Sequence, residues 1–588
     1  MTVEKLITDH IDIWSSALQT RSTAGRGSSG KIDLYGIKKL RELILELAVR
    51  GKLVPQDPND EPASELLKRI EKEREGLVKS RKIRKSKVLG PVDTSELPFE
   101  LPRGWEWCYL NDVGNWGAGA TPNRSNSKYY DGNIPWFKSG ELSSDFISES
   151  EEKVTELALK ECSLRDNKVG DVLIAMYGAT IGKTSILNVR GTTNQAVCAC
   201  TPYSGISNVY LLTLLKAYKR IFIGMGAGGA QPNISREKLI ATVIALPPNA
   251  EQNRIVYKVN ELMSLCDQLE QQSLTSLDAH QQLVETLLAT LTDSQNEKEL
   301  AENWLRINQH FDTLFTTEAS IDALKQTILQ LAVMGKLVPQ DPNDEPASEL
   351  LKRIEQEKAQ MVKNGKIKKQ KPLPPISDEE KPFELPQGWE WCRLGNLAHN
   401  SEAGWSPQCE VSPRVDDNWG VLKISSVTWS EFNPNENKAL PKHLEPKIEY
   451  EVKARDFLIS RANTADLVAR SVVVPDSPPN HLMLSDKIIR FQFSKLVDAN
   501  YINLVNNSKY SRTYYSEVAG GTSSSMKNVS RIQVSSLLVA LPSYNEQLNI
   551  VEKVRNLTLL CEHLKSRLQS AQQTQFHLAD ALTDAALN

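Results

Sequence analysis

Residues 47–73 read LAVRGKLVPQDPNDEPASELLKRIEKE, and residues 331–357 read LAVMGKLVPQDPNDEPASELLKRIEQE. The two stretches differ only where Arg50 and Lys72 are replaced by Met334 and Gln356, and they begin 284 residues apart. Solenoid repeats have periods of roughly 20–50 residues, so this spacing indicates a duplicated unit instead. The chain is predicted to be two tandem copies of one design, and the question is what differs between them.

Each copy of the repeat predicts a helix, a stop and a second helix. In the first copy, apolar residues recur at helical spacing from Leu34 to Val49. Gly51 then ends that helix, and Pro62 suits the first turn of the next one. Before the repeat, residues 4–18 have the pattern of a short amphipathic helix. The repeated segments are therefore expected to form a helical frame.

Two globular regions follow the repeated segments. They open with PFELPRGWEWCYL at Pro98 and PFELPQGWEWCRL at Pro382, and both contain short β-type runs broken by Gly, Asn and Pro. Between their opening and closing segments, the two regions share almost no sequence. A shared frame is thus expected to carry two unlike heads. The tryptophans of the openings are predicted to be core residues: Trp105, Trp107, Trp389 and Trp391.

A long helix is predicted after each globular region, because apolar residues alternate in steps of four and three. The first helix, of roughly 40 residues, would be about 60 Å long. The two predicted seams consist of Ile255, Val259, Leu262, Cys266 and Leu269, and of Ile550, Val554, Leu557, Cys561, Leu564 and Leu568.

The composition limits the classes of protein to which the chain can belong. Its 588 residues suggest roughly four domains. The formal net charge of −3 does not indicate a nucleic-acid partner. No run approaches the roughly 18 apolar residues that a membrane helix needs, and the N-terminus is no signal peptide. The eight cysteines are scattered, which favours a reducing compartment and a cytoplasmic location.

This organisation resembles the specificity subunit of type I restriction–modification enzymes, in particular its larger, enterobacterial-type members. The resemblance rests on the repeated GKLVPQDPNDEPASELL segments, the LPxGWEW openings and the matching starts of the long helices. It implies an α+β fold in which two globular α/β target-recognition domains are joined by long antiparallel coiled-coil helices, as a tandem pseudo-twofold duplication. The implied domains are an N-terminal conserved helical region (1–97), target-recognition domain 1 (98–247), a central conserved region with a long helix and a helical hairpin (248–381), target-recognition domain 2 (382–542) and a C-terminal conserved long helix (543–588).

The resemblance also implies a function. Each target-recognition domain would read one half of a bipartite, asymmetric site in double-stranded DNA. Two modification (M) subunits would bind the repeated parts and methylate adenine with S-adenosylmethionine, and two restriction (R) subunits would add ATP- and Mg-dependent translocation and cleavage. The specificity subunit itself would have no active site and bind no cofactor. A different class remains open, namely an assembly scaffold whose heads bind proteins without reading bases.

Several near-motifs are weak evidence of chemistry in this chain. Residues 178–184 resemble a phosphate-binding P-loop, which would make the chain an NTP-dependent enzyme, but the glycines are one residue too close. Residues 224–229 fit GxGxxG, yet Pro232 interrupts the helix that should follow. Cys198 and Cys200 lack the second ligand pair of a zinc site. We therefore expect neither a catalytic constellation nor a metal site.

Candidate base-reading residues are polar and basic side chains in predicted loops, because amides pair with adenine and Arg or Lys with guanine in the major groove. Structural polar turns are the alternative interpretation. The candidates are Asn123, Arg124, Lys128, Lys138, Lys183, Gln231 and Asn233 in the first head, and Lys423, Ser425, Arg461, Asn463, Lys487, Ser524 and Lys527 in the second. Asn233 recurs as Asn528, so it is expected to turn the chain instead. Two basic runs near residues 81–87 and 366–371 are either solvated linkers or contacts to phosphates.

Overall fold

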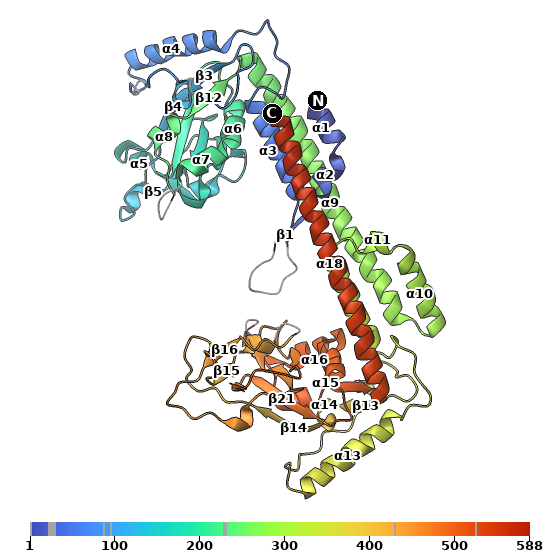
Figure 1. Ribbon diagram of the computed structural model, residues 1–588. Coiled ribbons are helices and arrows are strands. Elements are labelled where there is room, and N and C mark those ends of the chain that lie inside the picture. Colours follow the sequence, from blue (N-terminus) through green and yellow to red (C-terminus); the bar gives the residue numbers. More distant parts are fainter. Residues whose placement is uncertain are drawn as a thin grey trace. The chain divides into compact units, whose positions relative to one another are not determined.

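The computed structural model describes most of the chain and divides it into two units (Figure 1). Unit 1 contains residues 31–275 with both terminal segments of the chain, and unit 2 contains residues 276–571. The globular parts of the two units are called the first head (98–247) and the second head (382–542). The described residues are 3–21, 31–85, 89–93, 97–226, 232–427, 431–523 and 526–587.

The N-terminal segment differs from the expected single helix. It forms α1 (Val3–Thr8) and α2 (Ile11–Ser16), separated by a turn at residues 9–10. This turn allows Trp14 to become fully buried, with its indole N–H donated to the carbonyl of Leu6 (3.3 Å). A continuous helix over residues 4–18 was therefore the wrong prediction. The strands β1 (Gln19–Arg21) and β2 (Lys31–Asp33) then pair antiparallel.

The duplicated frame consists of two helix pairs. The helices are α3 (Tyr35–Val49) and α4 (Ala63–Lys79) in unit 1, and α12 (Glu318–Val333) and α13 (Ala347–Lys363) in unit 2. The predicted stop at Gly51 is confirmed by its positive φ of 66°, which Gly335 repeats at 70°. Pro62 is the N-cap residue of α4 and not part of its first turn. Near-identical sequence thus gives near-identical local structure.

The first head contains two main sheets. A five-stranded sheet has the order β4 (Gly114–Ala118), β11 (Val197–Pro202), β8 (Val172–Ala175), β9 (Thr184–Leu187) and β6 (Phe146–Ile147). A three-stranded sheet has the order β10 (Thr192–Thr193), β5 (Tyr130–Phe137) and β7 (Glu152–Val154). The opening strand β3 (Glu106–Tyr109) pairs with the closing strand β12 (Val243–Leu246). The helices are α5 (Glu156–Glu161), α6 (Asn208–Ala217), α7 (Lys219–Gly226) and α8 (Arg236–Ile240).

The second head has a related topology, in which four strands of the larger sheet match β4, β11, β8 and β9 of the first head in order. Its larger sheet has the order β14 (Ala398–Ala403), β21 (Ile488–Phe493), β17 (Phe457–Ser460) and β19 (Ser471–Val473). Its three-stranded sheet has the order β16 (Asn437–Ala439), β15 (Gly420–Leu422) and β20 (Leu482–Met483). Strands β13 (Glu390–Arg393) and β24 (Leu538–Leu541) pair as β3 and β12 do, and β18 (Ala462–Asn463), β23 (Met526–Asn528) and β22 (Gly520–Ser523) form a further sheet. The helices are α14 (Leu394–Leu397), α15 (Ala499–Asn507), α16 (Lys509–Val518) and α17 (Arg531–Ser535).

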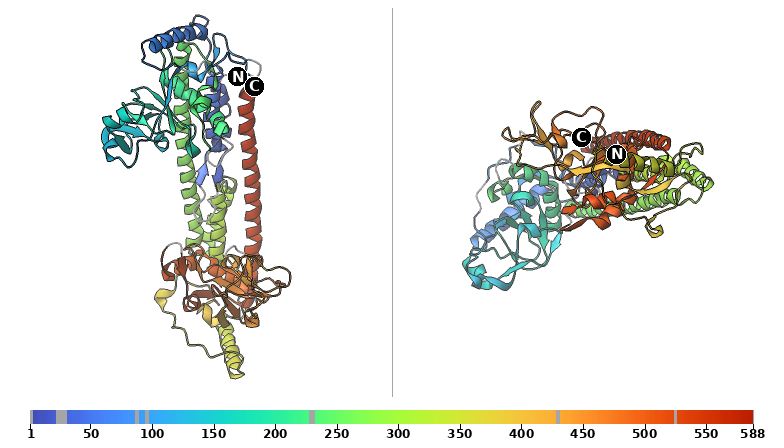
Figure 2. Two further views of the ribbon diagram at one scale, coloured as in Figure 1. Left: turned by 90° about the vertical axis from the view of Figure 1, so that its left-hand side faces the viewer. Right: turned by 90° about the horizontal axis from the view of Figure 1, so that it is seen from below.

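Two long helices follow the heads, α9 (Asn249–Asp293) and α18 (Tyr544–Leu587), drawn in green and red in Figure 2. Between them in sequence lie α10 (Glu297–Gln309) and α11 (Phe311–Leu314). The predicted seam of α9 is confirmed, since all five of its residues are buried, from Ile255 to Leu269. On α18, Ile550, Val554 and Cys561 are buried, whereas Leu557, Leu564 and Leu568 are only partly buried. No described helix is long and apolar enough to cross a bilayer.

The long helices run antiparallel within each unit. In unit 1, the contacts of α3 with Asp267 and Glu270 and the bond from Gln56 to Glu251 (3.1 Å) show that α9 runs against α3. Along α3, Tyr35 bonds to Asp580, and beyond its end Lys52 bonds to the carbonyl of Leu587, so α18 runs with α3. In unit 2 the two long helices exchange roles: α18 runs against α12, and α9 runs with it.

In unit 2, α12 packs against α18 in opposite directions. Lys565 pairs with Asp322 (3.1 Å), whereas Gln340, beyond the end of α12, bonds to Glu546 (3.1 Å) at the start of α18. Lys336 donates to the carbonyl of Thr292 (2.7 Å) at the end of α9. The fold is therefore α+β, with two globular α/β domains carried by a duplicated frame and long antiparallel helices.

Candidate functional site

The two heads can be matched at one position through a backbone hydrogen bond, although their sequences differ. After β8, the amide of Met176 donates to the carbonyl of Ala196 (2.8 Å). After β17, the amide of Arg461 donates to the carbonyl of Lys487 (2.7 Å) in the same way. These bonds show which loops of the two heads correspond, among them the loops that carry the candidates Lys183, Arg461 and Lys487.

Asn233 and Asn528 occupy equivalent positions, as their recurrence in the sequence suggested. Each forms an antiparallel bridge with the residue that follows Met176 or Arg461. Each also precedes a serine-capped short helix, α8 or α17, and both side chains are exposed.

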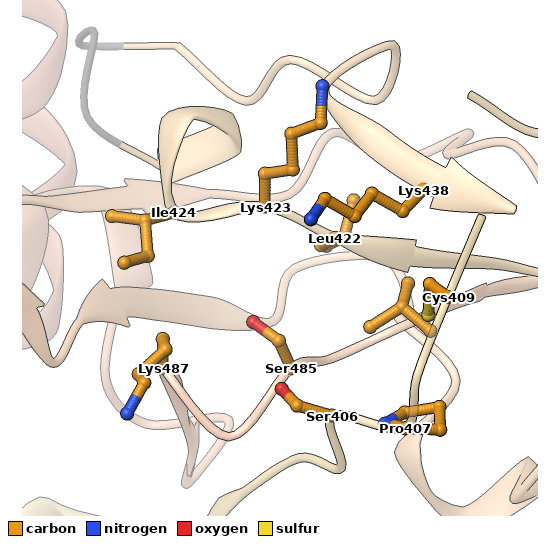
Figure 3. Close-up of a pocket in the computed structure, with 10 residues that line it drawn as sticks. Ser406, Pro407, Cys409, Leu422, Lys423, Ile424, Lys438, Ser485 and Lys487 are labelled. Atoms are coloured by element: carbon orange, nitrogen blue, oxygen red, sulfur yellow. The ribbon is translucent and has the colours of Figure 1, made fainter. Parts of the chain in front are cut away.

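A hollow of about 270 Å³ lies in the second head, between the three-stranded sheet and the segment that leads into β21 (Figure 3). Two candidates from the sequence, Lys423 and Lys487, line it together with Lys438. The hydroxyl groups of Ser406 and Ser485 line the same hollow. Three lysines and two serines on one concave surface suit an anionic or polar ligand such as a nucleic acid.

The carboxylate of Glu436 lies beside Lys423, one of the three lysines of this hollow. Glu436 is 3.6 Å from the Lys423 amine and accepts a hydrogen bond from the Ser425 hydroxyl (2.5 Å). The Ser425 bond, followed by the charge of Lys423, lowers the pKa of Glu436 below its usual value despite some burial. Glu436 is therefore ionised and holds both candidates in place.

The first head has an equivalent pair. Lys138 directly follows the central strand β5, as Lys423 follows β15, and it pairs with Glu152 (2.7 Å) at the start of β7. Glu436 precedes the corresponding strand β16. The heads thus share a lysine–glutamate pair at one topological position, which the sequence does not show because the flanking residues differ.

Glu152 also joins Arg124 to this cluster. Arg124 forms an ion pair with Glu152 and lies over the rings of Tyr130 and Trp136, with its guanidinium carbon 4.9 and 5.0 Å from their centroids. The hydrogen bonds from Arg124 and then Lys138 lower the pKa of Glu152. The cation is held by charge and by cation–π attraction, while more than half of its side chain remains exposed.

Lys183 lies on the near-P-loop, but that segment is not a phosphate loop. Residues 178–180 form a 3₁₀ turn, and β9 begins at Thr184, whereas a P-loop leads from a strand into a helix. The Lys183 carbonyl accepts a bond from Ala175 (2.8 Å) and its side chain is half-buried. The loop closes a turn between two strands, and the GxGxxG match lies partly outside the described residues.

Three further candidates of the second head lie on or directly before the paired strands β18 and β23. Arg461 is exposed and bonded to Lys487 through the backbone. Asn463 pairs with Lys527 across β18 and β23, and the Lys527 amine donates to the carbonyl of Gly521 (2.9 Å). Of the residues predicted in this head, Lys423 and Lys487 therefore line the hollow, Arg461 is bonded to Lys487, and Asn463 and Lys527 pair across two strands.

The positions of the other candidates do not associate them with either lysine–glutamate pair or with the hollow. Asn123 accepts from the amide and hydroxyl of Ser125 and so forms a polar turn, the alternative considered for these residues. Lys128 is exposed. Gln231 and Ser524 lie outside the described residues, as does Lys87 of the first basic run.

A second hollow, of about 440 Å³, lies in the first head. Its walls include Gln195 and Arg236, which sequence reasoning missed. Neither residue belongs to a recognisable motif, and only the fold brings Gln195 against Tyr177 and the end of β4. Lys438, Glu152 and Glu436 escaped prediction for the same reason.

Catalytic chemistry has little support in the described parts of the chain. No group of three or more His, Cys, Asp and Glu side chains in them has the arrangement of a metal site. Cys198 and Cys200 are fully buried, and burial raises the pKa of the Cys198 thiol to about 12, so it stays protonated. The buried Arg490 pairs with Asp456 (3.0 Å) inside the second head, which is a structural contact.

Comparison with known proteins gives a consistent picture. Residues 102–279 match the family described as "Type I restriction modification DNA specificity domain". Over the full length of both chains, the protein is 53% identical to the Type I restriction enzyme EcoEI specificity subunit and 48% identical to the EcoAI specificity subunit, both of Escherichia coli. A chain of a structure described as "Structural basis underlying complex assembly and conformational transition of the type I R-M system" is 16% identical, with a TM-score of 0.47 over 84% of this chain and 99% of that chain.

Proposed function

The chain belongs to the specificity subunits of type I restriction enzymes, and we propose that its two heads each read one half of a bipartite, asymmetric DNA site. The observation that carries this proposal is the pairing of one fold with two different polar surfaces. The topology, the lysine–glutamate pair and the bridging asparagine recur in both heads. The side chains around them do not, as expected of two readers with different targets.

The same comparison supports a division between positioning and reading. Lys138 and Lys423 occupy the same place in both heads, so they suit sequence-independent contacts to phosphates. The residues that differ between the heads suit contacts to base edges. The second head has the more basic hollow, with three lysines around it.

The duplicated surfaces support two copies of one partner. Exposed residues of the repeat keep their pairs, Lys68 with Glu65 and Lys352 with Glu349, both at 2.7 Å. Packing alone does not require exposed residues to be the same in both copies. We propose that two modification subunits bind these surfaces and that two restriction subunits complete the enzyme. This chain is then non-catalytic, with S-adenosylmethionine, ATP and Mg bound by the partner subunits.

Exchange of one head tests the division of labour. Residues 98–247 are replaced by the corresponding region of a relative, and the complex with modification subunits methylates a host genome. Methylome sequencing is expected to show one changed half-site and one unchanged half-site. A change in both halves, or in neither, would contradict independent reading.

A gel-shift experiment with the assembled complex separates DNA recognition from a pure scaffold. The complex is expected to bind a target-bearing duplex far more tightly than a random duplex, whereas a scaffold whose heads bind only proteins gives no difference. Lys138→Gln and Lys423→Gln each remove one phosphate contact. Each is expected to lower the slope of log affinity against log salt by about 1, on target and random DNA alike. Lys298→Gln, which removes an exposed charge on α10, is the matched control and leaves the slope unchanged.

A further inference from the structure

Gln195 and Asp486 occupy the same position in the two heads. Each directly precedes the residue whose carbonyl accepts the matched backbone bond, Ala196 in the first head and Lys487 in the second. Each accepts a hydrogen bond from a hydroxyl on the segment that follows the first strand of the larger sheet. Thr121 donates to the amide oxygen of Gln195, and Ser406 donates to the carboxylate of Asp486 (2.5 Å).

The backbone around this position is held tightly in both heads. Thr193 and Ala196 are buried in the first head, and Ser485 is buried in the second. The hydroxyl-bearing segment approaches so closely that a side chain on Gly119 would collide with the carbonyl of Thr193. Gly404 is pressed in the same way against the carbonyl of Leu484. The backbone at this position is therefore the same in both heads, and only the side chain that it carries differs.

Gln195 has the geometry of an adenine reader. It is exposed on the wall of the first head's hollow, and its amide oxygen accepts the hydrogen bond from the Thr121 hydroxyl. Its amide nitrogen donates no hydrogen bond to the described residues. The oxygen keeps a second lone pair for the N6 amino group of adenine, and the nitrogen is available to donate to N7.

Asp486 presents the opposite chemistry. Burial raises its pKa, but the Ser406 bond and the charge of Lys487, 3.4 Å away, outweigh burial and lower the pKa below its usual value. The ionised carboxylate only accepts hydrogen bonds. The cytosine N4 amino group is the base-edge donor that Asp or Glu recognises in the major groove.

We propose that Gln195 and Asp486 are equivalent specificity-determining residues, and that Gln195 reads an adenine in one half-site while Asp486 reads a cytosine in the other. Thr121 and Ser406 are positioning residues that orient them. This inference rests on the proposed function, because it assumes that both heads contact base edges.

The test uses the complex of the full chain with its modification subunits and a pool of duplexes randomised in both half-sites. The wild-type complex is expected to select an A·T pair in the first head's half-site. Replacement of that pair is expected to weaken binding by about 5- to 150-fold, which is about 1–3 kcal/mol at 1.4 kcal/mol per tenfold. Gln195→Ala is expected to abolish this preference and leave the affinity for random duplexes unchanged.

Two near-isosteric variants make the assignment falsifiable even if alanine disturbs the loop. Gln195→Glu keeps the acceptor for Thr121 and is expected to change the selected adenine to cytosine. Asp486→Asn is expected to change cytosine to adenine in the other half-site only. Each variant is the control for the other, because neither is expected to alter the half-site that the other changes.

The outcomes separate this inference from the function on which it rests. If the wild-type complex selects no motif, DNA recognition by the heads is wrong. If it selects a bipartite motif that both near-isosteric variants leave unchanged, the base assignment alone is overturned. Equal weakening of all duplexes by Gln195→Ala would also overturn it, because that result indicates a structural role.

Discussion

The two heads bury charge differently inside the same fold. Asp171 precedes β8 and Asp456 precedes β17, and each accepts a bond from the backbone amide three residues earlier (3.0 and 2.8 Å). In the second head Arg490 on β21 completes the ion pair. The strand register places Ala199 at the corresponding position of the first head. The fold therefore depends on the strand order and on the contacts of each head with the helical frame. It tolerates a buried ion pair in the sheet of one head and an alanine at the same place in the other.

Removal of Arg490 is expected to have the largest effect on this comparison. Arg490 and Asp456 are only 2% and 4% exposed, so Arg490→Met leaves a buried carboxylate without its cation. Breaking a buried pair in this way costs about 3–5 kcal/mol. Hydrogen exchange of peptides from β17 and β21 is expected to show that loss of local stability, while peptides of the first head keep their protection.

The matched control for Arg490→Met is Asp476→Asn. Asp476 pairs with Arg455 in the same head, but both side chains are largely exposed, at 74% and 79%. This variant is expected to leave exchange unchanged, because water solvates the unpaired charge. Similar effects of the two variants would mean that the buried pair does not stabilise the second head.

The contacts between the helical frame and the start of each head are expected to respond alike to the same substitution in both units. The sheets of the two heads are expected to respond differently. Gly51 and Gly335 have positive φ, and a Cβ on them would lie 2.5 Å from Pro102 and 2.6 Å from Pro386. Gly51→Ala and Gly335→Ala are each expected to destabilise their own unit by about 1–3 kcal/mol, through backbone strain and collision. Hydrogen exchange of α3 and α12 measures both effects.

Gly365 separates strain from collision in these variants. It also has a φ of 70°, but nothing lies within 4 Å of its would-be Cβ. Gly365→Ala therefore reports strain alone and is expected to cost less than Gly335→Ala. Equal losses at both positions would show that the proline contact contributes nothing to the joint.

The sequence predicted the frame well, because its signals are local. Helical spacing placed the end of α3 at Val49, and the heptad pattern identified the buried faces of α9 and α18. Because the two repeats are nearly identical in sequence, they were expected to form nearly identical turns at Gly51 and Gly335. The exception, the broken helix at residues 9–10, arises from tertiary packing of Trp14, which overrides a weak local preference.

The shared topology of the heads could not be predicted, because strand pairing depends on contacts distant in sequence. Lys138 and Glu152 are paired across two strands, and Gln195 meets Thr121 from 74 residues away. Chemical type alone suggested Lys423 and Lys487, which line one hollow, but it gave no reason to select Lys438 or Gln195. Residue type suggests what a side chain can bind, whereas only the fold shows which side chains act together.

The smallest expected effect is also the clearest in sign. Tyr210 and Tyr501 are the third residues of α6 and α15, and each donates its backbone amide to the N-cap side chain. Both rings are buried. The Tyr501 hydroxyl donates to the carbonyl of Ala540 (2.5 Å), whereas the Tyr210 hydroxyl has no partner among the described residues.

Substitution by phenylalanine should therefore act in different directions in the two heads. Tyr501→Phe removes a buried hydrogen bond and is expected to destabilise the second head by about 0.5–1.5 kcal/mol. Tyr210→Phe removes an unsatisfied hydroxyl, so it is expected to be neutral or stabilising. Hydrogen exchange of α6 and α15 measures both changes against the wild-type chain. Equal destabilisation of the two heads would indicate that Tyr210 has a bonded partner after all, such as a buried water, and that the heads resemble each other more closely than their protein contacts show.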